Sequence, residues 1–223
     1  TTVTHKFGNY GEKNSWTVNS ANIGKQGFHG STKTDTLNVT GSTKATIDLN
    51  KTSLYTSINN VSASKATAAM TIKGTSGSNY LIGGKGNDVL SGGKGNDTLK
   101  GGAGDDKISV SSTGTNRLYG GIGDDTITTS ASATDKIYFN AGDGKDIIIN
   151  SDNKDILYLN NITDIRSEAI FGMSGQDLVM NFTVNKDTDA ITITNWSTGG
   201  MNKFVVGGST YSLQQSGNKV SVK

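Results

Sequence analysis

The sequence is short of the residues that most folds use for stability and for chemistry. Its 223 residues include no cysteine and no proline, and aromatic residues make up only 7% of the chain. Without cysteine, the protein has neither a disulfide framework nor a thiol nucleophile. Hydrophobic residues amount to 32%, a low share of core-forming side chains for a globular enzyme of this length. We therefore expect a fold that draws stability from something besides a thick apolar core.

Membrane and leader segments are missing as well. No stretch approaches the roughly 20 consecutive apolar residues of a membrane-spanning helix, so we expect no membrane insertion. The first residues lack the basic-then-apolar pattern of a secretory signal peptide. Because residue 1 is Thr1 rather than methionine, we expect the chain to be a piece of a longer protein.

Known catalytic motifs do not occur. There is no HExxH motif, and residues 172–176 (GMSGQ) lack the final glycine of a GxSxG elbow. Residues 83–85 (GGK) are followed by Gly86, where a phosphate-binding loop needs serine or threonine. The two histidines, His5 and His29, do not have the spacing of zinc ligands. The sequence therefore predicts a protein that is not an enzyme.

Glycine, in contrast, is abundant, with 30 residues. Many of them belong to a nine-residue unit whose copies GGKGNDVLS, GGKGNDTLK and GGAGDDKIS follow one another without a gap over residues 83–109. A further copy, GGIGDDTIT, begins at Gly120. Each copy runs Gly, Gly, any, Gly, any, Asp, any, aliphatic, any. A flexible Gly/Asp linker has no reason to keep a fixed aliphatic position, so the repeat indicates a solenoid.

The unit predicts a loop followed by a short strand. Glycines at its first, second and fourth places permit tight turning of the backbone. Its last three residues carry one aliphatic side chain, for example Leu90 or Leu99, which suits a strand that faces a core. Two units then make one coil of eighteen residues, and repeats two apart in sequence stack. The predicted fold is all-β, a parallel β-roll.

Degenerate copies extend the predicted roll to residues 74–158. They keep the aliphatic place and either Asp or Asn at the sixth place. The five copies are residues 74–82 (GTSGSNYLI), 111–119 (SSTGTNRLY), 130–138 (SASATDKIY), 141–149 (AGDGKDIII) and 150–158 (NSDNKDILY).

Stacking of the coils brings sixth-position side chains together. We expect Asp88 to pair with Asp106, Asp106 with Asp125, and Asp97 to lie near Asn116. Two carboxylates at such close range repel unless a cation lies between them. Carboxylates and glycine carbonyls form an irregular cage of oxygen atoms, which favours Ca²⁺, and we expect several ions. The predicted metal-site residues are Gly84, Gly86, Asn87, Asp88, Gly93, Gly95, Asn96, Asp97, Gly102, Gly104, Asp105, Asp106, Asn116, Gly121, Gly123, Asp124, Asp125, Asp143, Asp146 and Asp155.

With these repeats the sequence resembles the RTX (repeats-in-toxin) family of haemolysin-type calcium-binding proteins. The resemblance extends from Gly74 to the C-terminus, although residues 216–223 show no recognisable secretion signature. It implies export by type I secretion machinery of Gram-negative bacteria and folding on contact with extracellular calcium. Without cations, a glycine-rich chain with repelling aspartates would remain disordered, which agrees with that implication.

The flanking segments predict two β-rich caps, residues 1–73 and residues 159–223. In the first, residues 36–39, 44–49 and 69–72 alternate apolar and polar side chains as strands do. In the second, residues 161–170 include a short helix, residues 177–183 and 190–196 form a hairpin, and Phe204 to Leu213 form another strand pair. The second segment resembles the cap that follows the repeats in many RTX proteins. We expect its core to contain Phe171, Phe182, Trp196 and Phe204.

Charge is unevenly distributed along the chain. Residues 74–158 contain eight Lys/Arg and eleven Asp, whereas the remaining residues contain thirteen basic and eight acidic groups. The acidity therefore lies where the ions are expected. The sequence contains no run of basic residues interleaved with aromatic ones, the pattern that would indicate nucleic-acid binding. Self-association and an acidic cell-surface polysaccharide are the candidate partners besides calcium.

Two hypotheses describe the parent protein. Richness in Thr, Ser, Asn and Gly, the lack of cysteine and β structure outside the roll favour a surface-layer protein or adhesin at the bacterial cell surface. The alternative is a folding and secretion appendage of a secreted protease, lipase, epimerase or toxin, because the family uses the same roll in all of them.

Overall fold

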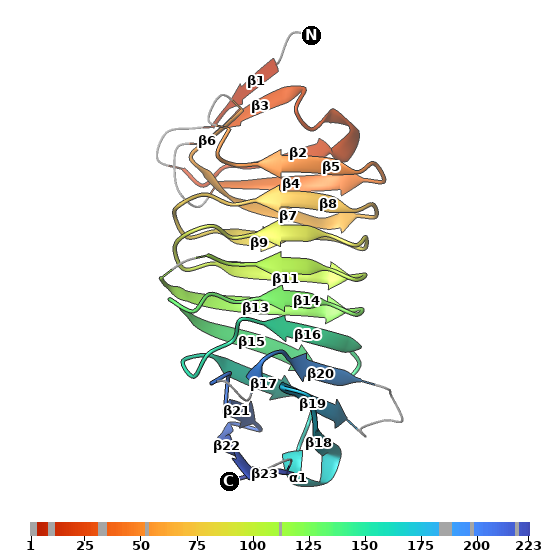
Figure 1. The fold of residues 1–223 in the computed structure, drawn as a ribbon. Coiled ribbons are helices and arrows are strands. Elements are labelled where there is room, and N and C mark those ends of the chain that lie inside the picture. The colour runs from red at the N-terminus through yellow and green to blue at the C-terminus, as the bar shows by residue number, and fades with distance from the viewer. Residues whose placement is uncertain are drawn as a thin grey trace.

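The protein is a stack of flattened coils in which two parallel sheets face each other (Figure 1). The computed structural model describes residues 4–8, 12–30, 35–51, 54–111, 113–182, 189–196, 199–216 and 219–223. The chain alternates between the two sheets, so each coil adds one strand to each of them. The predicted all-β parallel roll is confirmed. No helix among the described residues is long and apolar enough to cross a membrane.

Two large sheets account for most of the strands in the described residues. In spatial order, the nine-stranded sheet contains β18 (Ala169–Ser174), β19 (Asp177–Phe182), β20 (Ala190–Ile193), β16 (Lys145–Ile149), β14 (Thr126–Thr128), β12 (Lys107–Ser109), β10 (Val89–Ser91), β8 (Met70–Lys73) and β5 (Ala45–Asp48). The eleven-stranded sheet contains β2 (Ser15–Asn19), β4 (Asp35–Gly41), β7 (Ile58–Ala66), β9 (Tyr80–Ile82), β11 (Thr98–Ala103), β13 (Thr115–Ile122), β15 (Thr134–Asn140), β17 (Ile156–Asn160), β21 (Lys203–Val206), β22 (Ser209–Ser216) and β23 (Lys219–Val222).

Smaller elements lie near the two ends of the stack. A third, three-stranded sheet is formed by β1 (Thr4–Phe7), β3 (Gln26–His29) and β6 (Tyr55–Thr56). One 3-10 turn, η1, covers Ser20–Asn22, and one short helix, α1, covers Ile165–Glu168.

The core between the sheets consists of two aliphatic columns, one from each sheet. Parallel pairing places the aliphatic residue of each repeat directly beside that of the repeat two units away, for example Leu99 beside Leu118 and Ile108 beside Ile127. All four of these side chains are buried. Removing such a side chain from water contributes about 1.5–3 kcal/mol. The two columns therefore supply the hydrophobic contribution to the stability of the roll.

The predicted strands of the N-terminal segment are present. β4, β5 and β8 overlap the three alternating stretches, and they belong to the same two sheets as the repeats. The pairings of β7 with β9 and of β8 with β10 connect this segment to the repeats. The proposed boundaries at residues 73 and 158 remain a prediction, because the sheets continue through both of them.

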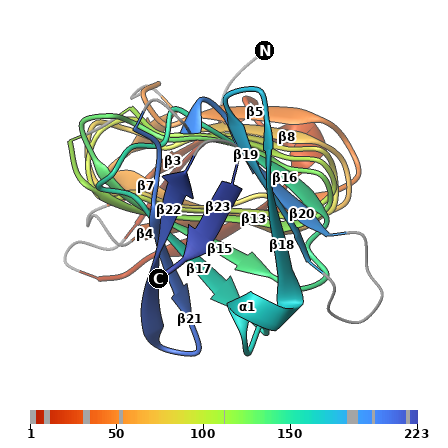
Figure 2. The same cartoon turned by 60° about the horizontal axis from the view of Figure 1, so that its bottom comes forward.

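The C-terminal segment ends the parallel stack with antiparallel pairs. β19 pairs with β20, and β21 pairs with β22, as the sequence predicts. The pairing of β18 with β19 was not predicted. The expected turn at residues 185–189 lies largely outside the described residues, which resume at Asp189. β18, β19, β22 and β23 lie across the end of the roll (Figure 2). Of the four aromatic residues predicted for the cap core, Phe182, Trp196 and Phe204 are buried, and Phe171 is partly exposed and packs against the hydrophobic core.

A column of tyrosines lies on the outer face of the eleven-stranded sheet. The rings of Tyr119 and Tyr138 stack with centroids 4.4 Å apart, and those of Tyr138 and Tyr158 are 4.7 Å apart. These tyrosines occupy the ninth place of the degenerate repeats. Cross-strand aromatic pairs stabilise a sheet beyond their buried area. The column therefore supports the coils whose glycine loops are least regular.

Replacing the middle ring is expected to destabilise the roll whether or not calcium is present. Tyr138→Ala removes both stacked pairs, each of which contributes about 0.5–1.5 kcal/mol beyond area burial. We expect a loss of about 2–4 kcal/mol, most of which Tyr138→Phe should not show because it keeps the stacking. Denaturant unfolding in EDTA and in calcium measures both variants. An equal loss in the two variants would assign the effect to the hydroxyl instead.

Candidate metal centre

Two rows of buried polar side chains run along the roll, one on each side. The loops that lead from the eleven-stranded to the nine-stranded sheet carry Asp88, Asp106, Asp125 and Asp146, here called the Asp106 row. The loops that lead the opposite way carry Asn79, Asp97, Asn116, Asp135 and Asp155, here called the Asp97 row. Every member of both rows is the residue just before or at the start of a strand, at the sixth place of its repeat.

In the Asp106 row each carboxylate accepts a hydrogen bond from the coil before it. The Asp88 amide donates to Asp106 Oδ1 at 2.6 Å, and the Asp106 amide donates to Asp125 Oδ1 at 2.7 Å. The row continues from the Asp125 amide to Asp146 Oδ1 at 3.1 Å, and begins with the Met70 amide bonded to Asp88 Oδ1 at 2.6 Å. The predicted pairs of Asp106 with Asp88 and with Asp125 are confirmed as neighbours.

The Asp97 row repeats this pattern with two neutral members. The Asp97 amide donates to Asn116 Oδ1 at 2.9 Å, which confirms the predicted proximity of these residues. The Asn79 amide donates to Asp97 Oδ1 at 2.9 Å. Asn116 Nδ2 donates to Asp135 Oδ1 at 2.7 Å, and the Asp135 amide donates to Asp155 Oδ1 at 2.8 Å. Two asparagines give this row a lower charge than the Asp106 row.

Three carboxylate oxygens in these rows have no hydrogen-bond donor. Among the described residues, the Oδ2 atoms of Asp97, Asp106 and Asp125 are buried without a partner. A Cβ atom at Gly101 would meet both Asp106 Oδ2 and the carbonyl oxygen of Gly120 in the next coil. Carboxylate and carbonyl oxygens therefore converge on one space that only glycine leaves open. Buried acceptors without donors are costly unless a cation satisfies them.

Burial changes the acidity of these groups. Desolvation, followed by repulsion from neighbouring carboxylates, raises the pKa of Asp106 to about 8 and that of Asp125 to about 7. Desolvation likewise raises the pKa of Asp97 to about 6, with the charge of Asp135 adding to the effect. It also raises the pKa of Asp146 to about 8 and that of Asp155 to about 7. Without a cation, these sites therefore tend to hold protons.

The donor set fits calcium. In the described part of the chain, no three or more His, Cys, Asp and Glu side chains form a metal-binding group. An ion at the unpaired oxygens would therefore be held by one or two aspartates together with backbone carbonyls. Ca²⁺ accepts such irregular sets of six to eight oxygens, whereas Mg²⁺ requires a near-ideal octahedron. A bound ion supplies the positive charge that the buried carboxylates lack.

Comparison with known families agrees with this geometry. Residues 73–108 and 110–133 match the model of the RTX calcium-binding nonapeptide repeat, in four copies. The chain carries RTX calcium-binding repeats. Twelve solved chains match the structure, among them the extracellular lipase LipA from Serratia marcescens, at 15% identity and a TM-score of 0.24. That match covers 72% of this chain and 42% of the lipase chain. No curated protein matches the sequence.

The second and fourth glycines of the RTX repeats hold adjacent coils together. These positions are Gly84, Gly86, Gly93, Gly95, Gly102, Gly104, Gly121 and Gly123. A Cβ at Gly102 or Gly121 would meet the carbonyl oxygen of the glycine one coil earlier, and both residues have positive φ angles, 124° and 115°. The carbonyl of Gly84 accepts a hydrogen bond from the Ala103 amide at 2.9 Å. Side chains at these places would separate the coils that line the metal site.

The fifth-position residues of the RTX repeats are exposed on the outside of the loops. The Asp105 amide donates to Asn87 Oδ1 at 3.1 Å, and the Asp124 amide donates to Asp105 Oδ1 at 3.0 Å. On the other side of the roll, the Thr115 amide donates to Asn96 Oδ1 at 2.8 Å. Asn87, Asn96, Asp105 and Asp124 are thus placed in outer hydrogen-bonded chains, and the buried rows contain none of them. Their predicted role as ligands remains a prediction.

At the C-terminal end, the predicted residue Asp143 has a neighbour that the repeat pattern missed. Asp143 Oδ2 accepts hydrogen bonds from the amide and the side chain of Asn140, at 2.7 and 3.0 Å. Asp189 is buried, accepts from the Gly142 amide at 2.5 Å and contributes to a raised pKa of Asp143, whose main cause is desolvation. Asp189 thus attaches the C-terminal segment to the loop between β15 and β16.

A second missed residue lies at the N-terminal end. Asp35 is buried just before Leu37, and its Oδ1 accepts from the Asn14 amide at 2.6 Å. Both Asp35-Thr36-Leu37 and Asp189-Ala190-Ile191 keep the Asp, any, aliphatic part of the repeat; of its glycines, only the first is kept, as Gly30, and only in the former. A search for this three-residue part would have identified both positions.

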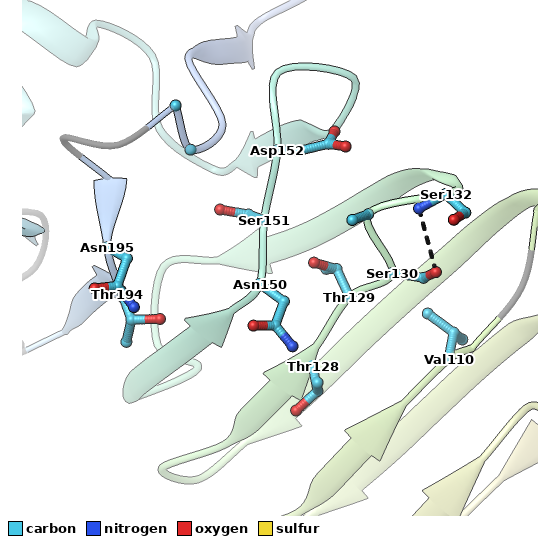
Figure 3. Close-up of a pocket in the computed structure, with 13 residues that line it drawn as sticks. Val110, Thr128, Thr129, Ser130, Ser132, Asn150, Ser151, Asp152, Thr194 and Asn195 are labelled. Atoms are coloured by element: carbon cyan, nitrogen blue, oxygen red, sulfur yellow. Dashed lines mark hydrogen bonds between the residues drawn. The ribbon is translucent and has the colours of Figure 1, made fainter.

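A polar cavity lies beside the Asp97 row. Its volume is about 640 Å³, and Thr128, Thr129 and Asn150 gather at its centre (Figure 3). Among its lining residues, Asp152 is the one ionisable side chain, and it forms an ion pair with Lys154 at 3.6 Å. The cavity therefore offers hydroxyl and amide groups rather than an acid and a base.

The raised pKa values predict that calcium stabilises the protein more at high pH. An unfolded aspartate titrates near pH 4, roughly, whereas the folded pKa values lie at about 6 to 8. Protonation therefore stabilises the calcium-free fold below about pH 4, and this contribution is lost as the pH rises through 6 to 8. Calcium must displace these protons, so its effect on the melting temperature should be small near pH 5 and large near pH 8.

Thermal unfolding with EDTA and with about 10 mM calcium, at both pH values, checks this expectation. Magnesium at the same concentration is the matched control, because it carries the same charge but demands a stricter geometry. A calcium-induced shift of equal size at both pH values would contradict the assignment of the sites to buried aspartates.

Proposed function

We propose that this calcium-binding RTX module folds on extracellular calcium and belongs to a type I-secreted bacterial surface protein, a surface-layer protein or an adhesin. The observation that carries the first half is the set of unpaired, buried oxygens of Asp97, Asp106 and Asp125. Extracellular calcium modules bind with dissociation constants of about 10⁻⁴–10⁻³ M, so such sites fill only outside the cell. Inside it, repulsion among the carboxylates keeps the chain ready for export.

Surface chemistry supports the second half of the proposal. Outward positions of the strands are dominated by Thr, Ser, Asn and Lys, and the cavity beside the Asp97 row is lined by hydroxyl and amide groups. We infer that the module is not itself catalytic and acts as a rigid, calcium-dependent spacer or assembly unit. Its parallel sheets continue from coil to coil, which suits a rigid, elongated spacer.

The experiment is assembly of the purified 223-residue chain with and without calcium. For a surface-layer or adhesin module, we expect calcium-dependent oligomers or sheets in light scattering and electron microscopy, and none in EDTA. A folded, calcium-loaded chain that stays monomeric at high concentration would favour the appendage of a secreted enzyme or toxin. Protease, esterase or glycosidase activity of the chain alone would overturn the non-catalytic assignment.

A further inference from the structure

The outer face of the eleven-stranded sheet carries a continuous column of aromatic and basic side chains. Lys100 Nζ lies over the rings of Tyr80 and Tyr119, at 5.7 and 5.0 Å from their centroids. Beyond Tyr119, the stacked rings of Tyr138 and Tyr158 continue the column. We call Tyr80, Lys100, Tyr119, Tyr138 and Tyr158 the tyrosine strip.

A second row of cations runs beside the strip. Strand pairing places Arg117 beside Lys136. On the next strand Lys136 pairs with Ile156, and Ile156 in turn pairs with Lys203. None of these cations, nor Lys100, forms an ion pair with a described carboxylate. The outward positions of β9, β11, β13, β15, β17 and β21 include no Asp or Glu. Although the roll as a whole is acidic, the charged side chains at these outward positions are therefore all positive.

The ring geometry restricts what the strip binds. The planes of Tyr119 and Tyr138 are 7° apart and those of Tyr138 and Tyr158 are 16° apart, so the inner ring faces cover one another. Single-stranded nucleic acids need open aromatic faces on which bases stack. The stacked rings expose their edges, rather than their faces, to solvent. Phenol groups beside ammonium and guanidinium groups suit hydroxyls and carboxylates.

We propose that the tyrosine strip binds a linear acidic polysaccharide laid along the axis of the roll. The coils repeat about every 4.8 Å, so the cations and phenol groups form a regular array that matches a periodic polyanion better than a globular partner. The charge of the strip is complementary to carboxylates, and its phenols pair with sugar hydroxyls. This surface is distinct from the two carboxylate rows, so the inference goes beyond the proposed function and does not require it.

The test uses hyaluronate, a linear polymer of uronate and amino sugar, as the probe. We measure its binding to the calcium-loaded 223-residue chain by isothermal titration calorimetry and affinity electrophoresis. Lys100→Gln/Arg117→Gln/Lys136→Gln should weaken binding at least about tenfold, and added salt should weaken binding of the unaltered chain. Tyr138→Phe keeps the stack and should weaken binding by a few-fold, roughly, through loss of one hydroxyl.

The matched control is Lys73→Gln/Lys107→Gln/Lys145→Gln. These three lysines are exposed on the outer face of the nine-stranded sheet, and the triple change removes the same charge. Binding should remain within about twofold of the unaltered chain, because distant exposed charges are screened. Circular dichroism shows whether each variant is folded; if the first triple variant is not, Lys136→Gln and Tyr138→Phe decide.

Other results would overturn the proposal. An equal loss of hyaluronate affinity in both triple variants would mean that the polymer is attracted to the net charge of the protein and does not bind the tyrosine strip. Binding to phosphatidylglycerol vesicles but not to hyaluronate would assign the strip to a membrane surface. Binding to neither, with a strip-dependent dimer in light scattering, would assign it to a second copy of this chain.

Discussion

Calcium is expected to convert the EDTA-treated chain from a weakly ordered polypeptide into a folded roll that unfolds cooperatively. The three unpaired oxygens of Asp97, Asp106 and Asp125 indicate about three strong sites. A ligand at a hundred times its dissociation constant stabilises the folded state by about 2.7 kcal/mol per site. Three such sites contribute about 8 kcal/mol, which is similar to the whole stability of a typical domain, about 5–15 kcal/mol.

The measurement is circular dichroism and thermal unfolding, first in EDTA and then with calcium raised through the millimolar range. The β signal and the melting temperature should rise together, and magnesium should reproduce little of the effect because of its stricter geometry. A chain that is fully folded in EDTA and unresponsive to calcium would show that the carboxylate rows do not organise the fold. The flanking strands would then have to account for its stability and function.

The arrangement of the roll could be predicted because its repeat fixes both the turn and the register. Glycines mark the loops of the intact repeats, and their nine-residue period pairs Leu90 with Ile108 on one sheet and Leu99 with Leu118 on the other. The inserted residue Val110 does not disturb the pairing, since it is taken up by the loop before β13. The repeat period alone therefore specifies the loops and the strand register of the roll, independently of the flanking segments.

The placement of side chains in the loops could be predicted only in part. Sixth-position residues such as Asp106 are buried, but their fifth-position neighbours, such as Asp105, are exposed. Successive residues near a strand point to opposite faces, so this alternation was available from the sequence. The same rule places the ninth residue outward, beside the buried eighth, which makes Tyr119, Tyr138 and Tyr158 a surface column.

Contacts across long stretches of sequence could not be predicted. Asp189 meets the loop at Gly142, 47 residues earlier in the chain, and nothing in the local pattern specifies that contact. It depends on how the antiparallel strands β19 and β20 end the stack. Tertiary packing, rather than local propensity, decides such positions.

Exchanging Asp106 for asparagine is expected to have effects of opposite sign with and without calcium. The buried carboxylate of Asp106 lies beside Asp88 and Asp125, and its Oδ2 has no donor. In EDTA near pH 8, Asp106→Asn removes an unfavourable buried charge, so the melting temperature should rise. In calcium it removes a ligand, and the loss of one ion costs about 3 kcal/mol.

Asp135→Asn is the matched control because Asp135 occupies the equivalent place in the Asp97 row with both oxygens already bonded. Oδ1 accepts from Asn116 Nδ2 at 2.7 Å and Oδ2 accepts from the Ser130 amide at 2.9 Å. This variant should lose stability by about 1 kcal/mol in EDTA and calcium alike, with an unchanged calcium increment. Denaturant unfolding of both variants in the two conditions measures the increments. If the two variants lost the same calcium increment, the unpaired oxygen of Asp106 would not distinguish its site from that of Asp135, and the carboxylates of both rows would have to contribute equally.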